Sequence, residues 1–247
     1  QKEALVLMLS TKNILSSSNG RPVAVPSQDM VLGLYFLTKG RKNGKGSGFS
    51  FSNSQEVIAA YQHESVDMHS LIKLRLKSGE IIDTTVGRVL LYDALPEDTD
   101  FSWINKAMKK KDIAKLISLS CKHCGIEATV IALDNIKKLG FLEATTGGIS
   151  LSIDNLLVPE SKDGIIEKSK KEVVLIEKLY RDGAITNGER YNKVIQVWAH
   201  ATEDVANEMI GSLEREDKHA CVNLDGKKKP FNPVFMMLDS GARGSRQ

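Results

Sequence analysis

The chain has 247 residues, enough for one large domain or two of ordinary size. Its 34 basic and 31 acidic side chains leave a net charge of only +3, so composition alone does not indicate a nucleic-acid-binding protein. No apolar run approaches the ~18 residues of a membrane span, and no charged and then apolar leader opens the chain.

The first 157 residues mix helical and strand patterns, which predicts an α+β unit. A short helix is expected over Lys2–Ser10, and Pro26 with Ser27 predicts the start of a second helix. The segment Lys39–Gly48 is basic and glycine-rich, but its spacings fit neither a P-loop nor a dinucleotide fingerprint. We therefore expect a solvent loop there and set aside a small phosphate-binding enzyme built on it.

Two strands are predicted next. Val66–Lys77 alternates apolar and charged residues, with Ile72 and Leu74 inward, and Ile81–Tyr92 is predicted to return beside it. The remaining elements expected in this unit are a helix capped by Ser54, helices over Phe101–Ala107 and Asp112–Cys124, a short helix through Ile136, and a strand through Ile149, Leu151 and Ile153.

The stretch Asp163–Leu213 has the pattern of two helices that pack against each other. Apolar residues recur at coiled-coil intervals in each half: Ile166, Val173, Ile176 and Tyr180, then Tyr191, Val194, Trp198, Ala201 and Val205. Between the halves, Gly183 can end the first helix, and Thr186 with Glu189 forms a T-x-x-E capping box that starts the second. The sequence therefore predicts an antiparallel coiled-coil hairpin.

The outer faces of this hairpin are expected to be polar nearly all round. They carry Lys168, Lys170, Lys171, Glu172, Lys178, Lys193, Gln196, Glu203 and Asp204. A hairpin that buries only its own seam tends to project from the body of a protein, whereas the alternative is a piece of helical bundle. We predict a projecting hairpin within a mostly helical unit over residues 158–247.

The three cysteines are an odd number, which argues against the disulfide framework of a secreted protein. Cys121 and Cys124 form one C-x-x-C, and His219 with Cys221 could in principle complete a zinc site. The spacing is not that of a zinc finger, and the C-x-x-C falls on a predicted helix. We expect buried thiols rather than a metal site.

Near the end of the chain, Gly241 and Gly244 flank a lone arginine, Arg243, in a segment with little other charge. Small neighbours let a ligand come close, and an arginine can donate bidentate bonds to phosphate. The alternative is an ordinary turn.

Several motifs strongly resemble the bacterial RNA polymerase beta-prime subunit. They are Pro26-Ser27-Gln28-Asp29 with Val31-Leu32-Gly33-Leu34-Tyr35, Thr84-Thr85-Val86-Gly87-Arg88, Gly188-Glu189-Arg190-Tyr191-Asn192-Lys193-Val194-Ile195 with Trp198, and Met236-Met237-Leu238-Asp239-Ser240-Gly241-Ala242-Arg243-Gly244-Ser245. Their order is that of the family, and the resemblance covers nearly the whole chain. The chain begins at Gln1 without a methionine, and we expect it to be an internal fragment.

The resemblance implies the pore and funnel region that walls the secondary channel of the polymerase. Nucleoside triphosphates enter and backtracked RNA leaves through that channel. Residues 1–157 would be pore-like and 158–247 funnel-like, with the hairpin, about 163–213, as the rim that docks transcript-cleavage factors. The motif that binds catalytic Mg²⁺ would lie outside the fragment, so we expect the fragment alone to be inactive and to hold no cofactor.

The same resemblance implies partners and residue roles. Expected partners are the beta, alpha and omega subunits, nucleoside triphosphates and the RNA 3′ end, with DNA contacted only through the parent enzyme in the cytoplasm. Arg243 would contact the incoming triphosphate, and channel residues near the RNA 3′ end would be Gln28, Asn13, Lys110 and Lys111. Regulators would contact Arg181, Asp182, Asn192, Lys193 and Gln196. The alternative function is a free-standing coiled-coil adaptor without enzymatic activity.

Overall fold

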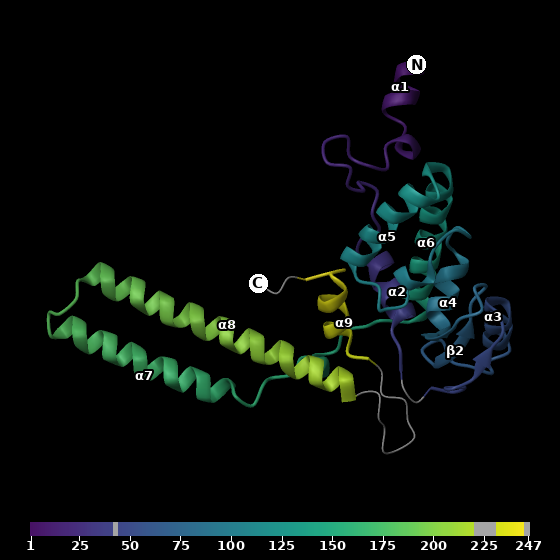
Figure 1. Cartoon of the computed structure of the whole chain (residues 1–247). Helices are drawn as coiled ribbons and strands as arrows, with labels where there is room; N and C mark the ends of the chain where they lie inside the picture. The colour runs from purple at the N-terminus through teal and green to yellow at the C-terminus, as the bar shows by residue number, and fades with distance from the viewer. Residues whose placement is uncertain (42–43, 220–230, 245–247) are drawn as a thin grey trace.

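The computed structural model describes residues 1–41, 44–219 and 231–244. It confirms an α+β fold, in which a body of helices carries a small three-stranded sheet and a long pair of helices projects from it (Figure 1). Among the described residues, none of the helices is both long and apolar enough to cross a membrane. The elements in chain order are α1 (Lys2–Leu7), η1 (Ser10–Lys12), α2 (Asp29–Thr38), β1 (Ser50–Phe51), α3 (Ser54–Gln62), β2 (Leu71–Arg75), β3 (Ile81–Thr85), α4 (Val86–Asp93), η2 (Phe101–Trp103), α5 (Lys110–His123), α6 (Ile126–Thr146), η3 (Ile153–Asn155), α7 (Lys162–Arg181), α8 (Asn187–His219) and α9 (Pro233–Ser240).

Helix α2 lies at the centre of the body, where α4, α6 and α9 pack against it. The backbones of α2 and α6 come into direct contact at Gly33. A Cβ atom built on Gly33 would lie 1.9 Å from the carbonyl oxygen of Gly140. A Cβ atom on Gly87 of α4 would likewise lie 1.9 Å from the carbonyl oxygen of Leu37. No larger residue fits at either glycine, so backbone contact fixes the position of α2.

The sheet has the order β1-β2-β3, with β1 parallel and β3 antiparallel to β2. The predicted alternation of β2 is confirmed, since Ile72 and Leu74 are buried whereas Lys73 and Arg75 face solvent. The two-residue strand β1 was not expected, and Ser50 pairs there with Lys73.

The predicted return strand Ile81–Tyr92 is wrong beyond Thr85. At that residue the strand gives way to α4, and the Thr85 hydroxyl accepts a hydrogen bond from the backbone N–H of Arg88. The threonine therefore caps a helix in the middle of an apolar run. Neither glycine nor proline stands between strand and helix, so the periodicity of the run concealed the change.

Other expectations for the body also need correction. The predicted strand through Leu151 and Ile153 is absent, and both side chains are exposed, at 60% and 86%. The predicted helix Phe101–Ala107 is a single 3₁₀ turn, whereas the short helix expected around Ile136 is the 21-residue α6. The helix expected to be capped by Ser54 starts one residue earlier than that, with Asn53 as its cap accepting a bond from Glu56 N–H.

Helices α7 and α8 form the projecting pair (Figure 1). Residues 182–186 join them, and the two arms run antiparallel, as the sequence predicted. Gly183 takes a left-handed conformation, with φ of +73°, and ends α7. The predicted capping box is present, because the Thr186 N–H donates to Glu189 Oε2 and the Glu189 N–H donates to the Thr186 hydroxyl.

The seam between the arms differs from the predicted stripe. Ile176 and Ala201 are buried as expected, but Val197 is buried in place of Trp198, which is 38% exposed. The seam of α8 thus follows Val194, Val197 and Ala201, at spacings of three and four residues. The spacing from Tyr191 to Trp198 therefore predicts a face that is rotated by one position from the packed face.

After the hairpin the chain returns to the body as α9, a helix that the sequence analysis did not predict. Asn232 caps it by accepting bonds from two backbone N–H groups, and Pro233 occupies the first helical position. Its Met236 packs with Leu32 and Tyr35 of α2. Helix α9 is therefore held against α2.

Candidate functional site

Two separate regions hold most of the residues singled out from the sequence: the end of the hairpin and the junction of α2, α5 and α9. At the end of the hairpin, Arg181 and Asp182 lie beside the turn and are exposed. Beside them Arg190 donates to Asn187 Oδ1, and its guanidinium lies 5.2 Å from the centre of the Tyr180 ring. The turn thus exposes polar side chains beside the first turn of α8, where Arg190 is held in place by these contacts.

Glu189 contributes to that order. The backbone N–H and the hydroxyl of Thr186 both bond its carboxylate, and they lower the pKa of Glu189 below its usual value. The carboxylate therefore stays ionised at neutral pH, in the first turn of α8 where the helix dipole favours a negative charge.

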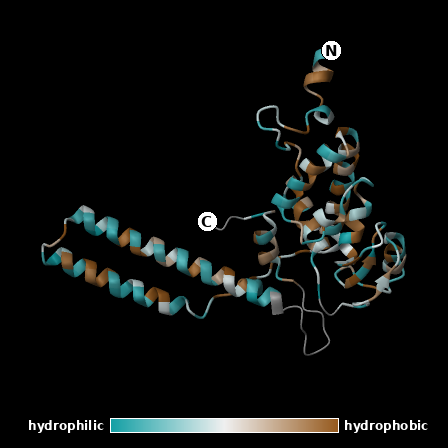
Figure 2. Cartoon of the chain, viewed as in Figure 1, coloured by the Kyte–Doolittle hydropathy of each residue, from teal (hydrophilic) through white to brown (hydrophobic). Residues whose placement is uncertain are grey.

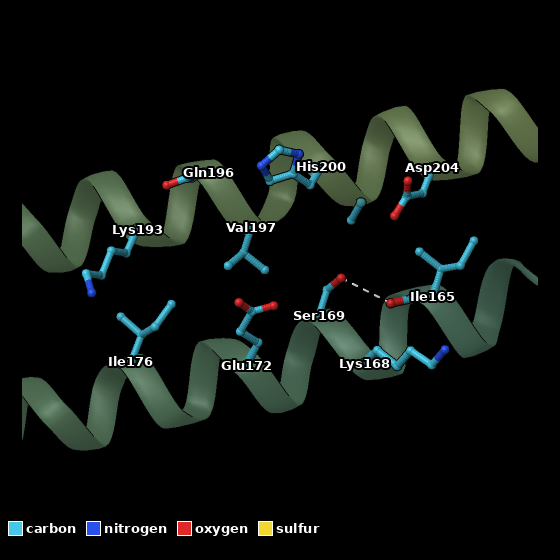
Figure 3. A pocket seen from close by; sticks show the side chains of 11 residues that line it. Ile165, Lys168, Ser169, Glu172, Ile176, Lys193, Gln196, Val197, His200 and Asp204 are labelled. Atoms are coloured by element: carbon cyan, nitrogen blue, oxygen red, sulfur yellow. Dashed lines mark hydrogen bonds between the residues drawn. The ribbon is translucent and has the colours of Figure 1, made fainter.

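Lys193 and Gln196 lie farther along α8 on a groove between the two arms, about 620 Å³ in volume (Figure 3). Val197 of α8 points into it toward Glu172 of α7, and Ile176 of α7 points into it toward Lys193. The charged and polar residues around it are Lys168, Ser169, Glu172, Lys193, Gln196, His200 and Asp204. The structure therefore brings Lys193 and Gln196 together on one face, and Asn192 is exposed beside them.

The hairpin also presents apolar side chains outward, which corrects the expectation of polar outer faces. Tyr191, Ile195 and Trp198 are 61%, 49% and 38% exposed and lie at i, i+4 and i+7 of α8. Val174 and Leu175 of α7 are exposed too. Apolar and polar segments accordingly alternate along both arms in Figure 2. We call Tyr191, Ile195 and Trp198 the outer stripe, since their spacing places them on one helix face.

The second region lies where α2, the start of α5 and the end of α9 meet. Asp239 of α9 joins the three, because it accepts hydrogen bonds from the Tyr35 hydroxyl at 2.8 Å and from Lys109 Nζ at 2.7 Å. Burial alone would raise the pKa of Asp239, but these two bonds outweigh burial and lower it. Sequence reasoning missed Asp239 and Lys109, since they are 130 residues apart.

Arg243 lies at the same junction. Its Nη2 donates to Asp29 Oδ1 at 2.9 Å, which ties the segment after α9 to the first turn of α2. Gln28, the residue before Asp29, is exposed and has φ of +47°, a conformation uncommon outside glycine. The structure thus brings the predicted residues Gln28 and Arg243 to one place through Asp29, for which the sequence predicted no role.

The other predicted channel residues lie on two different elements. Lys110 and Lys111 are exposed in the first turn of α5, and a Cβ atom on Gly241 would lie 3.5 Å from Lys110 Cβ. They therefore border the junction. Asn13 is instead bound locally, because its side-chain amide donates to the carbonyl oxygens of Leu7 and Leu9.

The two described cysteines are not part of a metal cluster among the described residues. Cys121 and Cys124 are free thiols and are half-buried, so the expectation of burial holds only in part. Cys221 and the side chain of His219 lie outside the part of the chain that the structure describes. Within that part, no three His, Cys, Asp or Glu side chains come close enough to hold a metal ion.

Two family models match this chain on either side of α7. The family described as RNA polymerase Rpb1, domain 3, matches residues 13–156, and RNA polymerase Rpb1, domain 4, matches residues 185–247. The DNA-directed RNA polymerase subunit beta′ of Thermodesulfovibrio yellowstonii is 46% identical over 246 residues, which is 99% of this chain. That of Chromobacterium violaceum is 44% identical over 260 aligned residues, again 99% of this chain.

The chain belongs to the RNA polymerase beta-prime family. The resemblance inferred from its motifs is therefore confirmed. The chain spans 18% of the length of each of these two relatives. The free-standing adaptor loses its support, because the similarity to these beta-prime subunits extends over the hairpin and the body alike.

Proposed function

We propose that this chain forms part of the wall of the secondary channel in a bacterial DNA-directed RNA polymerase. The observation that carries the proposal is the projecting hairpin, whose turn and first helical residues are exposed, in a chain of the beta-prime family (Figure 1). A hairpin that stands clear of its own body is accessible to a second protein. The division into a pore-like unit of residues 1–157 and a funnel-like unit of 158–247 belongs to the same proposal.

At the junction of α2, α5 and α9, Arg243 would bind a phosphate of the incoming nucleoside triphosphate. Its planar guanidinium suits paired phosphate oxygens. Gln28, Lys110 and Lys111 would face the RNA 3′ end from the same junction, and Asn13 from the segment before it. Mg²⁺ would be held by residues outside this chain, because the described side chains offer no group of three acidic, His or Cys ligands. The isolated chain would therefore be inactive in nucleotidyl transfer.

The assembled enzyme would place this chain beside the beta, alpha and omega subunits in the cytoplasm. On its hairpin, Arg181, Asp182, Asn192, Lys193 and Gln196 would contact transcript-cleavage factors and other channel-binding regulators. The outer stripe adds apolar area and two residue types, tyrosine and tryptophan, that are enriched among the strongest contributors to protein interfaces. We therefore include it in the docking surface.

The test is a binding titration of a cleavage factor to a polymerase whose beta-prime subunit carries Lys193→Glu. We expect binding to weaken up to about fivefold, as for an exposed ion pair, while RNA synthesis without the factor is unchanged. Lys171→Glu is the matched control, because Lys171 is exposed on α7 and does not line the groove. Equal loss of factor binding and of RNA synthesis in Lys193→Glu would show that the hairpin has a structural role instead.

A further inference from the structure

The bond between Arg243 and Asp29 joins residues that are 214 positions apart. It uses one of the five N–H donors of a guanidinium, and the two side chains are 55% and 46% exposed. The remaining donors of such a group can therefore bind a second anion without breaking the bond to Asp29. The arrangement is compatible with a carboxylate on one edge of the guanidinium and a phosphate on another.

The two partners differ in how firmly their backbones are held. Arg243 lies between Gly241 and Gly244, which have φ of +71° and +85° and carry no side chain to restrict them. Asp29 lies in the first turn of α2, and the contact between Gly33 and Gly140 fixes that helix against α6. The carboxylate thus stands on a helix fixed by backbone contact, whereas the arginine lies in a turn, where its backbone N–H bonds the carbonyl oxygen of Met237 at 3.4 Å.

Both partners also face one open depression. Asp29 and Arg243 line it with Leu32 and Met237, and α6 closes its far side. The depression measures about 340 Å³. A ligand that reaches Arg243 from this side therefore meets the Asp29 carboxylate as well. The effect of that carboxylate on the affinity for an anionic ligand can be measured.

We propose that Asp29 is a positioning residue, which holds the Arg243 guanidinium so that its remaining donors face the phosphates of the incoming nucleotide. The inference rests on the proposed role of Arg243. Without the carboxylate the arginine samples other rotamers, and binding the triphosphate then requires ordering a long side chain. Preorganisation of this kind strengthens binding of the nucleotide and leaves the chemical step alone.

The experiment measures single-nucleotide addition by a reconstituted polymerase with Asp29→Asn in its beta-prime subunit. We expect the KM for the nucleoside triphosphate to rise about two- to fivefold, the range of an exposed ion pair, with kcat unchanged. Asp29→Glu, which keeps the carboxylate, should recover part of the loss. Asp134→Asn is the matched control, because Asp134 forms an exposed ion pair with Lys137 on α6, and KM should not change.

A double-mutant cycle separates this role from a merely structural one. In an Arg243→Ala background, Asp29→Asn should have no further effect on KM. Independent effects of the two substitutions, an unchanged KM in Asp29→Asn, or a lower KM because the carboxylate repels phosphate would each overturn the inference. If Arg243→Ala itself has no effect, the proposed phosphate contact fails first, and the inference falls with it.

Discussion

The Nζ atom of Lys39 lies 2.7 Å from both carboxylate oxygens of Asp217, and each side chain is only 10% exposed. Lys39 follows α2 directly, whereas Asp217 belongs to the last turns of α8. The ammonium group also lies 4.3 Å from the centre of the Phe231 ring, just before α9. A buried, charged bond thus joins the base of the hairpin to the body.

Lys39→Met should destabilise the chain by about 3–5 kcal/mol, because it leaves the Asp217 carboxylate buried without its cation. Replacing both residues, with Asp217→Leu added, should restore most of that loss, since no charge is then left in the site. Urea unfolding followed by circular dichroism measures both. A Lys39→Met variant as stable as the parent protein would show that water reaches the carboxylate. The exposed pair of Lys171 and Glu167 is the control, and Lys171→Met should cost less than about 1 kcal/mol.

The hairpin could be predicted from sequence because its signals are local. The left-handed Gly183 and the box formed by Thr186 and Glu189 each span a few residues. The bond between Lys39 and Asp217 could not be predicted, because no local pattern links residues 178 positions apart. Helix α9 has local start signals in Asn232 and Pro233, but with only eight residues it is too short for periodicity to reveal it, and it depends on packing against α2.

The corrected seam predicts different costs for the same substitution on two faces of the hairpin. Ile176→Ala should destabilise the hairpin by about 2–5 kcal/mol, because Ile176 is 7% exposed and packs between the arms. Ile195→Ala should cost less than about 1 kcal/mol, since Ile195 is 49% exposed on the outer stripe. Hydrogen exchange of the α7 and α8 amides measures this difference locally. Equal destabilisation by the two substitutions would contradict the placement of Ile176 in the seam and of Ile195 outside it.

His69 should make the body sensitive to mild acid. Burial lowers the pKa of His69 to about 4, helped by the positive charges of Arg41 and Lys39. Because the unfolded chain binds the proton near pH 6.5, the stabilisation from neutral His69 is complete above that pH. It is lost as the pH falls from about 6.5 to about 4, and the loss amounts to about 3 kcal/mol.

The measurement is the free energy of unfolding at several pH values, compared with that of His69→Asn. Asparagine keeps an N–H group near the position of Nδ1, which bonds the carbonyl oxygen of Lys39. The variant should be less stable at every pH, since it loses ring contacts with Phe36 and Phe231. Its stability should nevertheless fall less steeply between pH 6.5 and pH 4. Parallel curves for the two proteins would assign the acid sensitivity to other groups.

Arg243→Ala in a reconstituted polymerase should lower kcat/KM for nucleotide addition by about ten- to a hundredfold. That range corresponds to a charged hydrogen bond of about 1.5–3 kcal/mol. Arg243→Lys should recover only part of the loss, because the charge returns without the planar fork. The assay is single-nucleotide addition on a fixed scaffold across triphosphate concentrations. A change within about twofold would leave Arg243 as a turn residue paired with Asp29.

Sequence reasoning predicted separate residues of the candidate site more readily than their arrangement. Gln28 and Arg243 were named independently, and only the structure shows Asp29 between them. Trp198 is seven residues from Tyr191, a spacing that predicts a place in the seam, yet it lies in the outer stripe. Neighbouring positions on an α-helix are about 100° apart around the axis. Assigning the seam to a residue one position away therefore rotates the predicted packing face by about that angle.

The hairpin is attached to the body at the base of α8, and its turn lies at the opposite end. Helix α8 has 33 residues, so it extends about 50 Å from its base to the turn at 1.5 Å per residue. A rotation of about 5° at the base would carry the turn through about 4 Å, more than the length of a hydrogen bond. Accurate placement of Arg181 and Asp182 before a partner therefore depends on side chains at the opposite end of the helix. We therefore expect substitutions near Asp217 to displace the turn at the other end of the hairpin.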